Sequence, residues 1–331
     1  MASENEIDTE TKNTTIPIFF SSNDDYAPWL GVAMHSLVTN ADPNRNYTIV
    51  VMDEDLSEEH KAKLRALVEG KDNFELRLVP MEGKIQGVFD RVGNRLRTDY
   101  FTMTIFFRLF IPTMFPEWDK GIYLDADIVV PGDISQMYDI DLEGAYVGAC
   151  HDRSIAGVPE LVEYVGPGVG VGIENYVNSG ILLMDMKTLR EHKLAERFLE
   201  LFTTYHFESI APDQDYLNAL CFGHIKFMPD EWDVMPIQGS KDFENPKLIH
   251  YNLFDKPWLY DNVQYGDYFW DYAKDSGFEE EARIYKANYS DEEKAKDAES
   301  MNRLLSMGVK LAHDPEHNFA GVFNTGKEPR L

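Results

Sequence analysis

The chain has 331 residues, 44% of them hydrophobic, which is enough for one large domain or two modest ones with a substantial core. Its formal net charge of −27 repels the phosphates of nucleic acids and anionic lipid headgroups, so we expect no nucleic-acid partner and no membrane association through charge. No apolar run reaches the roughly 18 residues typical of a membrane-spanning helix.

Cysteine content and the N-terminal sequence indicate the cytoplasm. Cys150 and Cys221 are too few for a disulfide framework, and each lies in an apolar run typical of a buried side chain. Residues 1–15 are polar and acidic, and they lack the basic start and apolar middle of a signal peptide. We expect them to form a disordered lead-in to a cytoplasmic protein.

Strand and helix patterns alternate through the first part of the chain. Short apolar runs predict strands, and apolar residues spaced three and four apart predict helices. The predicted strands cover 16–22, 46–53 and 74–80, and the predicted helices cover 26–40 and 57–70. This βαβαβ order predicts an α/β fold with a parallel, right-handed, doubly wound sheet.

Further strands and helices follow. A helix over 99–112 leads to a strand that opens the segment 121–130, "GIYLDADIVV". Strands are then predicted over 145–150, 180–186 and 224–229, and helices over 186–205 and 213–222. The glycine-rich run 165–174 lacks the strand-to-helix context of a dinucleotide-binding loop, so we expect a mobile loop there.

Helices rich in acidic and aromatic residues fill the end of the chain. We therefore expect three parts: the disordered lead-in over 1–15, an α/β domain over 16–258, and a C-terminal helical appendage over 259–331. The appendage has 9 Lys and Arg against 15 Asp and Glu, which is not the composition of a basic membrane anchor.

Three polar clusters follow predicted strands, at the edge where open α/β sheets bind ligands. They are "SSNDDY" (21–26), "DAD" (125–127) and "HYNLFDKPW" (250–258). Each cluster is ordinary by itself. Their shared placement at strand ends predicts a single site.

The aspartates of the second cluster, Asp125 and Asp127, predict a divalent metal site. Two carboxylates this close repel each other, and a hard cation such as Mg²⁺ or Mn²⁺ relieves the repulsion by binding both. His250 could supply a nitrogen ligand, which favours Mn²⁺. The alternative is a solvated turn with an Asx hydrogen bond, the commoner fate of two nearby aspartates. The strongly apolar flanking residues argue against that alternative.

Lys256 is a candidate for contact with a leaving group. An ammonium beside a metal stabilises the negative charge of a departing diphosphate, and Pro257 and Trp258 would stiffen its segment. The alternative is an ordinary surface lysine.

The order of these motifs resembles glycosyltransferase family 8, a family of retaining nucleotide-sugar transferases. The resemblance covers roughly residues 16–258 and implies the GT-A fold, a Rossmann-like, mainly parallel sheet flanked by helices. A D-x-D by itself is weak evidence because it occurs in unrelated loops, whereas six motifs in one order are strong evidence. The motifs are "IFFSSNDDYAPWLGVAMHSL", "FFRLFIP", "KGIYLDADIVV", "YVNSGILLMD", "DQDYLNAL" and "HYNLFDKPW".

The resemblance also assigns roles to matching positions. The implied metal ligands are Asp125, Asp127 and His250. The implied nucleotide-sugar-binding residues are Ser21, Ser22, Asn23, Tyr26, Arg108, Asp125, Ala126 and Lys256, the first four at the uridine edge. The implied catalytic residues, around the reacting sugar, are Arg108, Asn178, Asp213 and Gln214.

Several of these positions have other interpretations. Arg108 could pair with a structural acid, Asn178 could open an ordinary turn, and Asp213 could be a helix N-cap. Two positions also depart from the family pattern. Asn23 stands where members often have aspartate, so uracil could be held differently, and Leu253 stands where glycine is usual, so a positive φ there would be strained.

The resemblance implies transfer of a hexose, glucose or galactose, from a UDP-sugar to a hydroxyl acceptor, with Mn²⁺ or Mg²⁺ as the cofactor. We expect the acceptor to be a glycan of cell-surface polysaccharide or lipooligosaccharide synthesis. We also expect retention by same-face attack, because the amide of Gln214 is a poor nucleophile. The C-terminal helices could select the acceptor or mediate a homo-oligomer.

Two other functions are weighed against this one. A nucleotidyltransferase on a similar sheet would need a glycine-rich, basic phosphate loop after the first strand, where this chain has the acidic "SSNDDY". A non-catalytic nucleotide-sugar-binding protein would not need the intact D-x-D, DQ and H…K motifs.

Overall fold

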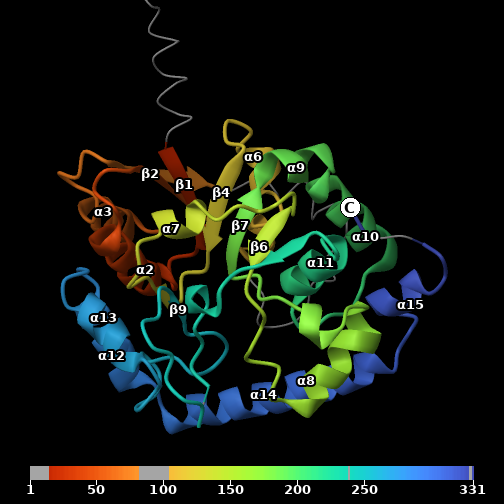
Figure 1. The fold of residues 1–331 in the computed structure, drawn as a ribbon. Coiled ribbons are helices and arrows are strands. Elements are labelled where there is room, and N and C mark those ends of the chain that lie inside the picture. Colours follow the sequence, from red (N-terminus) through yellow and green to blue (C-terminus); the bar gives the residue numbers. More distant parts are fainter. Residues whose placement is uncertain (1–14, 82–103, 238, 328–329) are drawn as a thin grey trace, which may run out of the picture.

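The fold is centred on a seven-stranded sheet, shown in Figure 1. The computed structural model describes residues 15–81, 104–237, 239–327 and 330–331. Most of the lead-in expected over 1–15 therefore lies outside the described residues. Thr15 does not belong to it, because the first strand begins there.

The strands follow the order β3-β2-β1-β4-β7-β6-β8. Their bounds are β1 Thr15–Ser22, β2 Asn46–Asp53, β3 Phe74–Pro80, β4 Lys120–Leu124, β6 Val147–Ala149, β7 Ile181–Asp185 and β8 Ile225–Phe227. β1 to β4 pair in parallel, as β6 and β8 do, whereas β7 runs antiparallel to both of its neighbours. The prediction of a mainly parallel α/β sheet is confirmed. The sheet is not wholly parallel, because β7 is antiparallel.

A second, two-stranded sheet joins β5 Ile128–Val129 to β9 Ile249–His250. These strands are antiparallel, and Ile128 pairs with His250. The pairing brings the end of the chain's α/β region back to the segment directly after β4.

Helices cover both faces of the main sheet and enclose two hydrophobic cores. β1 contributes to both, because successive side chains of a strand point to opposite faces: Phe19 belongs to one core, Ile18 and Phe20 to the other. The helices are α2 Ala27–Asn40, α3 Glu58–Ala66, α5 Thr104–Phe107, α6 Ile111–Met114, α7 Ser135–Tyr138, α8 Pro159–Tyr164, α9 Met186–Glu191, α10 Leu194–Tyr205, α11 Pro212–Leu220 and the 3₁₀ turn η3 Asp230–Trp232.

Two predicted helices are interrupted. The helix expected over 186–205 is divided into α9 and α10 by Lys193, whose φ of 58° lies in the left-handed region that a continuous helix excludes. The helix expected over 99–112 is two short helices within its described part. Proline is tolerated only in the first turn of a helix, and α6 accordingly begins just before Pro112.

The run 165–174 is not a loop, as its glycines had suggested. Its first half forms a π-helical turn, η1 Val165–Val169, and its end a 3₁₀ turn, η2 Ile173–Asn175. The three valines of the run, Val165, Val169 and Val171, are buried in the core. The prediction of a mobile loop is therefore wrong.

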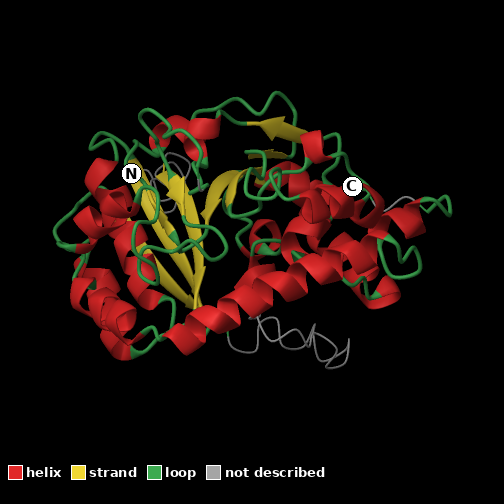
Figure 2. Ribbon diagram, turned by 90° about the horizontal axis from the view of Figure 1, so that it is seen from below, coloured by secondary structure: helices red, strands yellow, loops and turns green. Residues whose placement is uncertain are grey.

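The C-terminal helices pack on the rest of the molecule. They are α12 Gly266–Ala273, α13 Glu279–Asn288, α14 Asp291–Ala312 and α15 Phe319–Phe323. α12 and α13 pack against α2, whereas α14 contacts α8 and η1. Figure 2 shows α14 crossing the molecule as one long helix. The last residue, Leu331, donates its N–H to the carbonyl of Leu220 at 3.0 Å. No helix in the described part of the chain is long and apolar enough to cross a membrane.

The contact between α2 and the start of α13 leaves no room for a side chain at Gly31. A Cβ there would lie 2.1 Å from two ring atoms of Phe278, which is fully buried. We predict that Gly31→Ala lowers the free energy of unfolding by about 1–3 kcal/mol, because the Phe278 ring must move out of a packed site. Urea denaturation measures the change.

Gly157→Ala is the matched control for this prediction. A Cβ at Gly157 would meet no atom within 4 Å, so the control should unfold like the unsubstituted protein. Equal stability of both variants would show that the α2–Phe278 contact is not tightly packed.

Candidate active site

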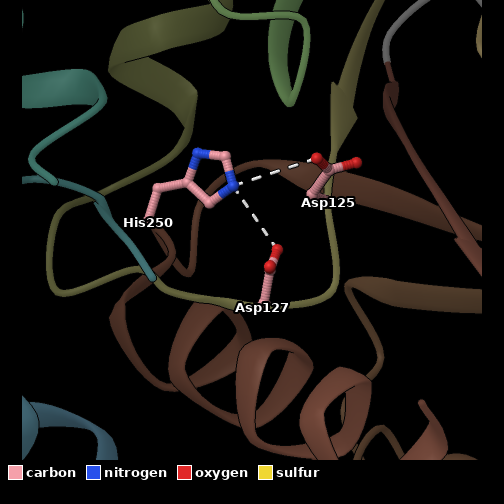
Figure 3. Close-up of side chains that lie close together, drawn as sticks. All are labelled: Asp125, Asp127 and His250. Carbon is pink, nitrogen blue, oxygen red and sulfur yellow. Dashed lines mark ion pairs between the residues drawn. The ribbon is translucent and has the colours of Figure 1, made fainter. Parts of the chain in front are cut away.

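Asp125, Asp127 and His250 converge at the carboxyl end of β4, as Figure 3 shows. Asp125 directly follows β4, and Asp127 directly precedes β5. His250 arrives through the β5–β9 pairing. Its Nε2 lies 3.8 Å from Asp125 Oδ2 and 3.4 Å from Asp127 Oδ1, and one ligand atom from each residue lies within 4.8 Å of the other two.

This donor set fits a hard divalent cation. Two carboxylates and one imidazole are ligands suited to Mn²⁺, and to Mg²⁺ through the oxygens. Gly180 lies directly against these side chains: a Cβ there would lie 2.5 Å from Asp125 Oδ2 and 2.6 Å from His250 Cε1. Only glycine leaves the space between these ligands open.

Arg108 compensates the charge of Asp125. Its Nη2 lies 2.9 Å from Asp125 Oδ1, and Tyr123 Oη donates to the same oxygen at 2.7 Å. The other side of the guanidinium reaches Asp213, with Nε 3.1 Å from Oδ2. Burial lowers the pKa of Arg108, but the two carboxylates raise it by more, so the arginine stays charged. The pairing with an acid that we gave as an alternative does occur, and both acids belong to the site.

Lys256 compensates the charge of Asp127. Its Nζ lies 2.5 Å from Asp127 Oδ2 and donates to the carbonyl of Tyr251 at 2.8 Å. Lys256 is 8% exposed, so the alternative of a surface lysine is wrong. Burial raises the pKa of Asp127, and the ammonium of Lys256 with the ring of His250 lowers it by more. The carboxylate therefore stays ionised, and the solvated Asx turn is not what these aspartates form.

A buried carboxylate that sequence reasoning missed, Asp233, contacts the other side of the histidine ring. Its Oδ1 lies 3.1 Å from His250 Nδ1. Burial lowers the pKa of His250, but hydrogen bonds to Asp127 and Asp233 raise it to about 10. In sequence, Asp233 is one acid among several in "PDEWDV"; only its position between the apolar Trp232 and Val234 hints at burial.

The catalytic pair expected at the start of α11 is held by the turn before β7. Ser179 Oγ donates to Asp213 Oδ2 at 2.7 Å, and the Ser179 N–H donates to Gln214 Oε1 at 3.0 Å. The N-cap of α11 is Ala211, so the N-cap interpretation of Asp213 is wrong. Asn178 lies in the same turn, where its Oδ1 accepts the N–H of Gly180 at 2.7 Å.

Asp152, a second residue that sequence reasoning missed, holds the amide of Gln214. Gln214 Nε2 donates to Asp152 Oδ2 at 2.8 Å, while Ser154 donates its N–H to Oδ1 at 3.0 Å. With Ser179 on its oxygen and Asp152 on its nitrogen, the Gln214 amide has one orientation. Asp152 follows β6 in "CHDRS", which offers no recognisable pattern.

The residues of the expected uridine edge form the turn after β1. Ser22 is buried and donates its hydroxyl to the Asn23 carbonyl at 2.9 Å, and Asn23 Oδ1 accepts the N–H of Tyr26 at 3.0 Å. Ser21 is the penultimate residue of β1. Tyr26 is 42% exposed. The charge of Lys256 lowers the pKa of Tyr26, while desolvation and the charges of Asp127 and Asp125 raise it by more.

Two further positions were singled out in the sequence. Ala126, between the aspartates, is buried and packs in the core on the α2 side of the sheet. Leu253 adopts the positive φ that would favour glycine, 56°, and its N–H donates to Asn252 Oδ1 at 2.8 Å. The strain expected at this leucine is present.

Comparison with known proteins agrees with this geometry. A sequence model described as "Glycosyl transferase family 8" matches residues 17–262. The chain belongs to this family. Glycosyl transfer is thus the reaction class that membership supports.

Relatives of this family 8 protein are 25–30% identical to it over the aligned residues. General stress protein A of Bacillus subtilis is 25% identical over 267 residues, covering 75% of this chain and 88% of that protein. Lipopolysaccharide 1,2-glucosyltransferase of Escherichia coli is 30% identical over 185 residues, covering 51% and 54%. Glycosyltransferase GlyB of Streptococcus pneumoniae is 28% identical over 277 residues, covering 78% and 61%. The chain thus spans little more than half of the last two relatives.

Solved structures share the GT-A fold. The bifunctional glycosyltransferase WbbM matches with a TM-score of 0.71 at 24% identity, covering 83% of this chain and 52% of that one. The galactosyltransferase LgtC, in complex with donor and acceptor sugar analogues, matches with a TM-score of 0.63 at 24% identity, covering 78% and 95%.

A second buried carboxylate of α11, Asp215, anchors this helix. Tyr164 and Tyr176 each donate a hydroxyl to it at 2.6 Å, and Ser209 donates a third. No exposed surface remains on Asp215. Burial raises its pKa to about 6, against 3.8 for an ordinary aspartate.

Asp215 predicts a pH dependence of stability. Because its folded-state pKa is raised, the folded protein holds a proton between about pH 4 and pH 6 that the unfolded chain has lost. The protonated Asp215 therefore stabilises the folded protein fully below about pH 4, and this stabilisation is lost as the pH rises through about 6. For a pKa difference of about two units, the loss in free energy of unfolding is about 3 kcal/mol.

We predict that Asp215→Asn removes this contribution. Urea denaturation at pH 4 and pH 7 measures the free energy of unfolding of both proteins. Relative to the original protein, the variant should be more stable at pH 7 than it is at pH 4. The exposed Asp275→Asn serves as the control. A difference that does not change with pH would contradict the raised pKa.

Proposed function

We propose that this family 8 protein is a metal-dependent, retaining hexosyltransferase that uses a UDP-sugar. The observation that carries the proposal is the convergence of Asp125, Asp127 and His250 beside Lys256, at the sheet edge where α/β proteins bind ligands. LgtC, a structural neighbour, has been solved with donor and acceptor sugar analogues, which supports a sugar-nucleotide donor and a sugar acceptor for this site.

Asp125, Asp127 and His250 would hold the metal. When bound, Mn²⁺ or Mg²⁺ supplies a Lewis acid that stabilises negative charge on the departing diphosphate. The nitrogen ligand favours Mn²⁺. Lys256, whose ammonium already lies among these ligands, adds a second positive charge for the same leaving group.

The remaining residues divide between nucleotide and sugar. We assign the uridine to the turn after β1, with Ser21, Ser22, Asn23 and Tyr26, and place the backbone of Ala126 between the metal ligands at the donor. We assign the sugar to the residues linked by the β7 turn: Arg108, Asn178, Asp213 and Gln214. The hydrogen bonds of Ser179 to the last two fix which atoms they present.

The residues near the sugar favour same-face attack over a covalent intermediate. Gln214 carries a weakly basic amide, Asp213 is paired with Arg108, and Asp215 has both oxygens occupied by hydroxyl donors. None is placed as a free nucleophile. In same-face attack the acceptor oxygen bonds to the anomeric carbon as the bond to the diphosphate breaks, and a diphosphate oxygen takes the acceptor's proton. A trapped sugar–enzyme adduct would contradict this route.

The acceptor is proposed to be a glycan in cell-surface polysaccharide or lipooligosaccharide synthesis, with glucose or galactose as the transferred sugar. The similarity to a lipopolysaccharide glucosyltransferase supports this class. Both cysteines are free and buried, in keeping with the proposed cytoplasmic location. A homo-oligomer through the C-terminal helices stays a prediction.

The test of the function is nucleotide release from a panel of UDP-sugars with Mn²⁺, Mg²⁺ or a chelator. We predict that Asp127→Asn lowers release by about 100-fold or more, because one charged metal ligand becomes neutral. Asp275→Asn, an exposed change of the same kind, should leave the rate unaltered. Near-normal release by Asp127→Asn with metal present would show that the metal assignment is wrong.

The panel also separates the two other functions. Slow donor hydrolysis without an acceptor distinguishes an enzyme from a protein that only binds the donor. Exchange of pyrophosphate into a nucleoside triphosphate would identify a nucleotidyltransferase.

Lys256→Ala tests the leaving-group role. The variant should release nucleotide about 10- to 100-fold more slowly, because the diphosphate loses one of its positive partners. Circular dichroism should show that it remains folded, and Lys256→Arg should recover part of the rate. If Lys256→Ala leaves the rate unchanged, Lys256 neutralises Asp127 but does not stabilise the leaving group.

A further inference from the structure

Asp233 is the most deeply buried acid near the metal site, and it lies outside every motif that matches the family. Its side chain has 0% exposure, and Oδ1 lies 3.1 Å from His250 Nδ1. The other ring nitrogen, Nε2, faces Asp125 and Asp127. The histidine thus stands between one carboxylate and the two that would hold the metal.

Backbone hydrogen bonds fix Asp233 and His250 relative to each other. The N–H of Val234 donates to the carbonyl of Leu248 at 3.0 Å, and the N–H of His250 donates to the carbonyl of Val234 at 2.9 Å. The segment after η3 therefore runs beside β9. The contact between the two side chains follows from this pairing rather than from a chance rotamer.

Stability alone does not explain an acid at this position. Asp233 Oδ2 is buried and has no hydrogen-bond partner among the described residues. An unpaired carboxylate oxygen in the interior is costly, and an apolar residue of similar size would avoid that cost. Among the described residues, the side chain that Asp233 bonds is His250.

We propose that Asp233 is a positioning residue for the metal site: it accepts the Nδ1–H of His250 and so presents the Nε2 lone pair toward Asp125 and Asp127. A metal that binds the ring displaces the proton of one nitrogen, and the hydrogen-bond partner of the other nitrogen decides which proton the ring keeps. Without the acceptor, the ring could rotate or place its proton on Nε2. The proposal rests on the metal assignment made under the proposed function.

The test measures Mn²⁺ affinity directly, from the electron paramagnetic resonance signal of unbound Mn²⁺, with and without UDP. Asp233→Leu keeps the side-chain size but removes the acceptor, and it should weaken Mn²⁺ binding about 10-fold or more. Asp233→Asn keeps a carbonyl oxygen for Nδ1 and should stay within a few-fold of the original protein. Asp230→Leu, the same change at an exposed aspartate three residues earlier, should have no effect.

Asp127→Asn separates failure of this inference from failure of the function. If Asp127→Asn abolishes Mn²⁺ binding while a folded Asp233→Leu binds as the original protein does, only the role of Asp233 is overturned. If both variants bind Mn²⁺ as the original protein does, the assignment of the metal site is wrong as well.

The proposed role of Asp233 can also be tested in the unsubstituted protein, in case Asp233→Leu does not fold. Nitrogen-15 spectra of the Mg²⁺-loaded protein should show His250 with a hydrogen-bonded proton on Nδ1. A ring without a proton on Nδ1 would overturn the proposal.

Discussion

The constraint on which the site depends is the burial of several carboxylates close together. The side chains of Asp125, Asp127 and Asp213 are 24%, 13% and 10% exposed, and an ion left unpaired in such an enclosed place is destabilising. Arg108 compensates the first and third, and Lys256 compensates the second. Each cation comes from a segment remote in sequence from its partners, so the ion pairs that make burial tolerable also determine where those segments lie. The same contacts therefore neutralise the carboxylates and position the side chains of the candidate site.

The antiparallel strand β7 has a consequence for this arrangement. Because β7 runs against β4, its first residues lie at the edge where the parallel strands end, and Ile181 pairs with Leu124. The turn that precedes β7 therefore meets the D-x-D. Ser179 contacts Arg108, Asp213 and Gln214, and the carbonyl of Gly180 accepts the N–H of Asp125 at 2.8 Å. One turn connects the proposed metal ligands to the residues assigned to the sugar, which a wholly parallel sheet would not have allowed at this strand.

Sequence patterns predicted the parts of the fold that local chemistry determines. Apolar runs located the strands, and the motifs located Asp125, Asp127 and His250, which the structure brings together, because carboxylates at a strand end are informative without knowledge of their neighbours. Asp152 and Asp233 could not be found in this way, since neither lies in a recognisable motif and each acquires its role from a partner 62 or 17 residues away. The break at Lys193 lies among good helix formers and has no local signal. The run 165–174 was misjudged because its glycines were weighed above its valines, which the core buries.

The C-terminal helices are part of the site's support. His60 lies between two acids: Nδ1 is 2.6 Å from Asp24 Oδ1, in the turn assigned to uridine, and Nε2 is 3.0 Å from Glu281 Oε2, on α13. Burial lowers the pKa of His60, but the hydrogen bonds to both acids raise it by more. Lys63 binds the same glutamate from α3. The turn after β1 is thus braced through α3 by a helix that lies beyond the residues matched by the family. Phe278, at the start of that helix, also packs against Gly31. The C-terminal helices therefore pack against residues on the other side of the boundary expected at residue 258.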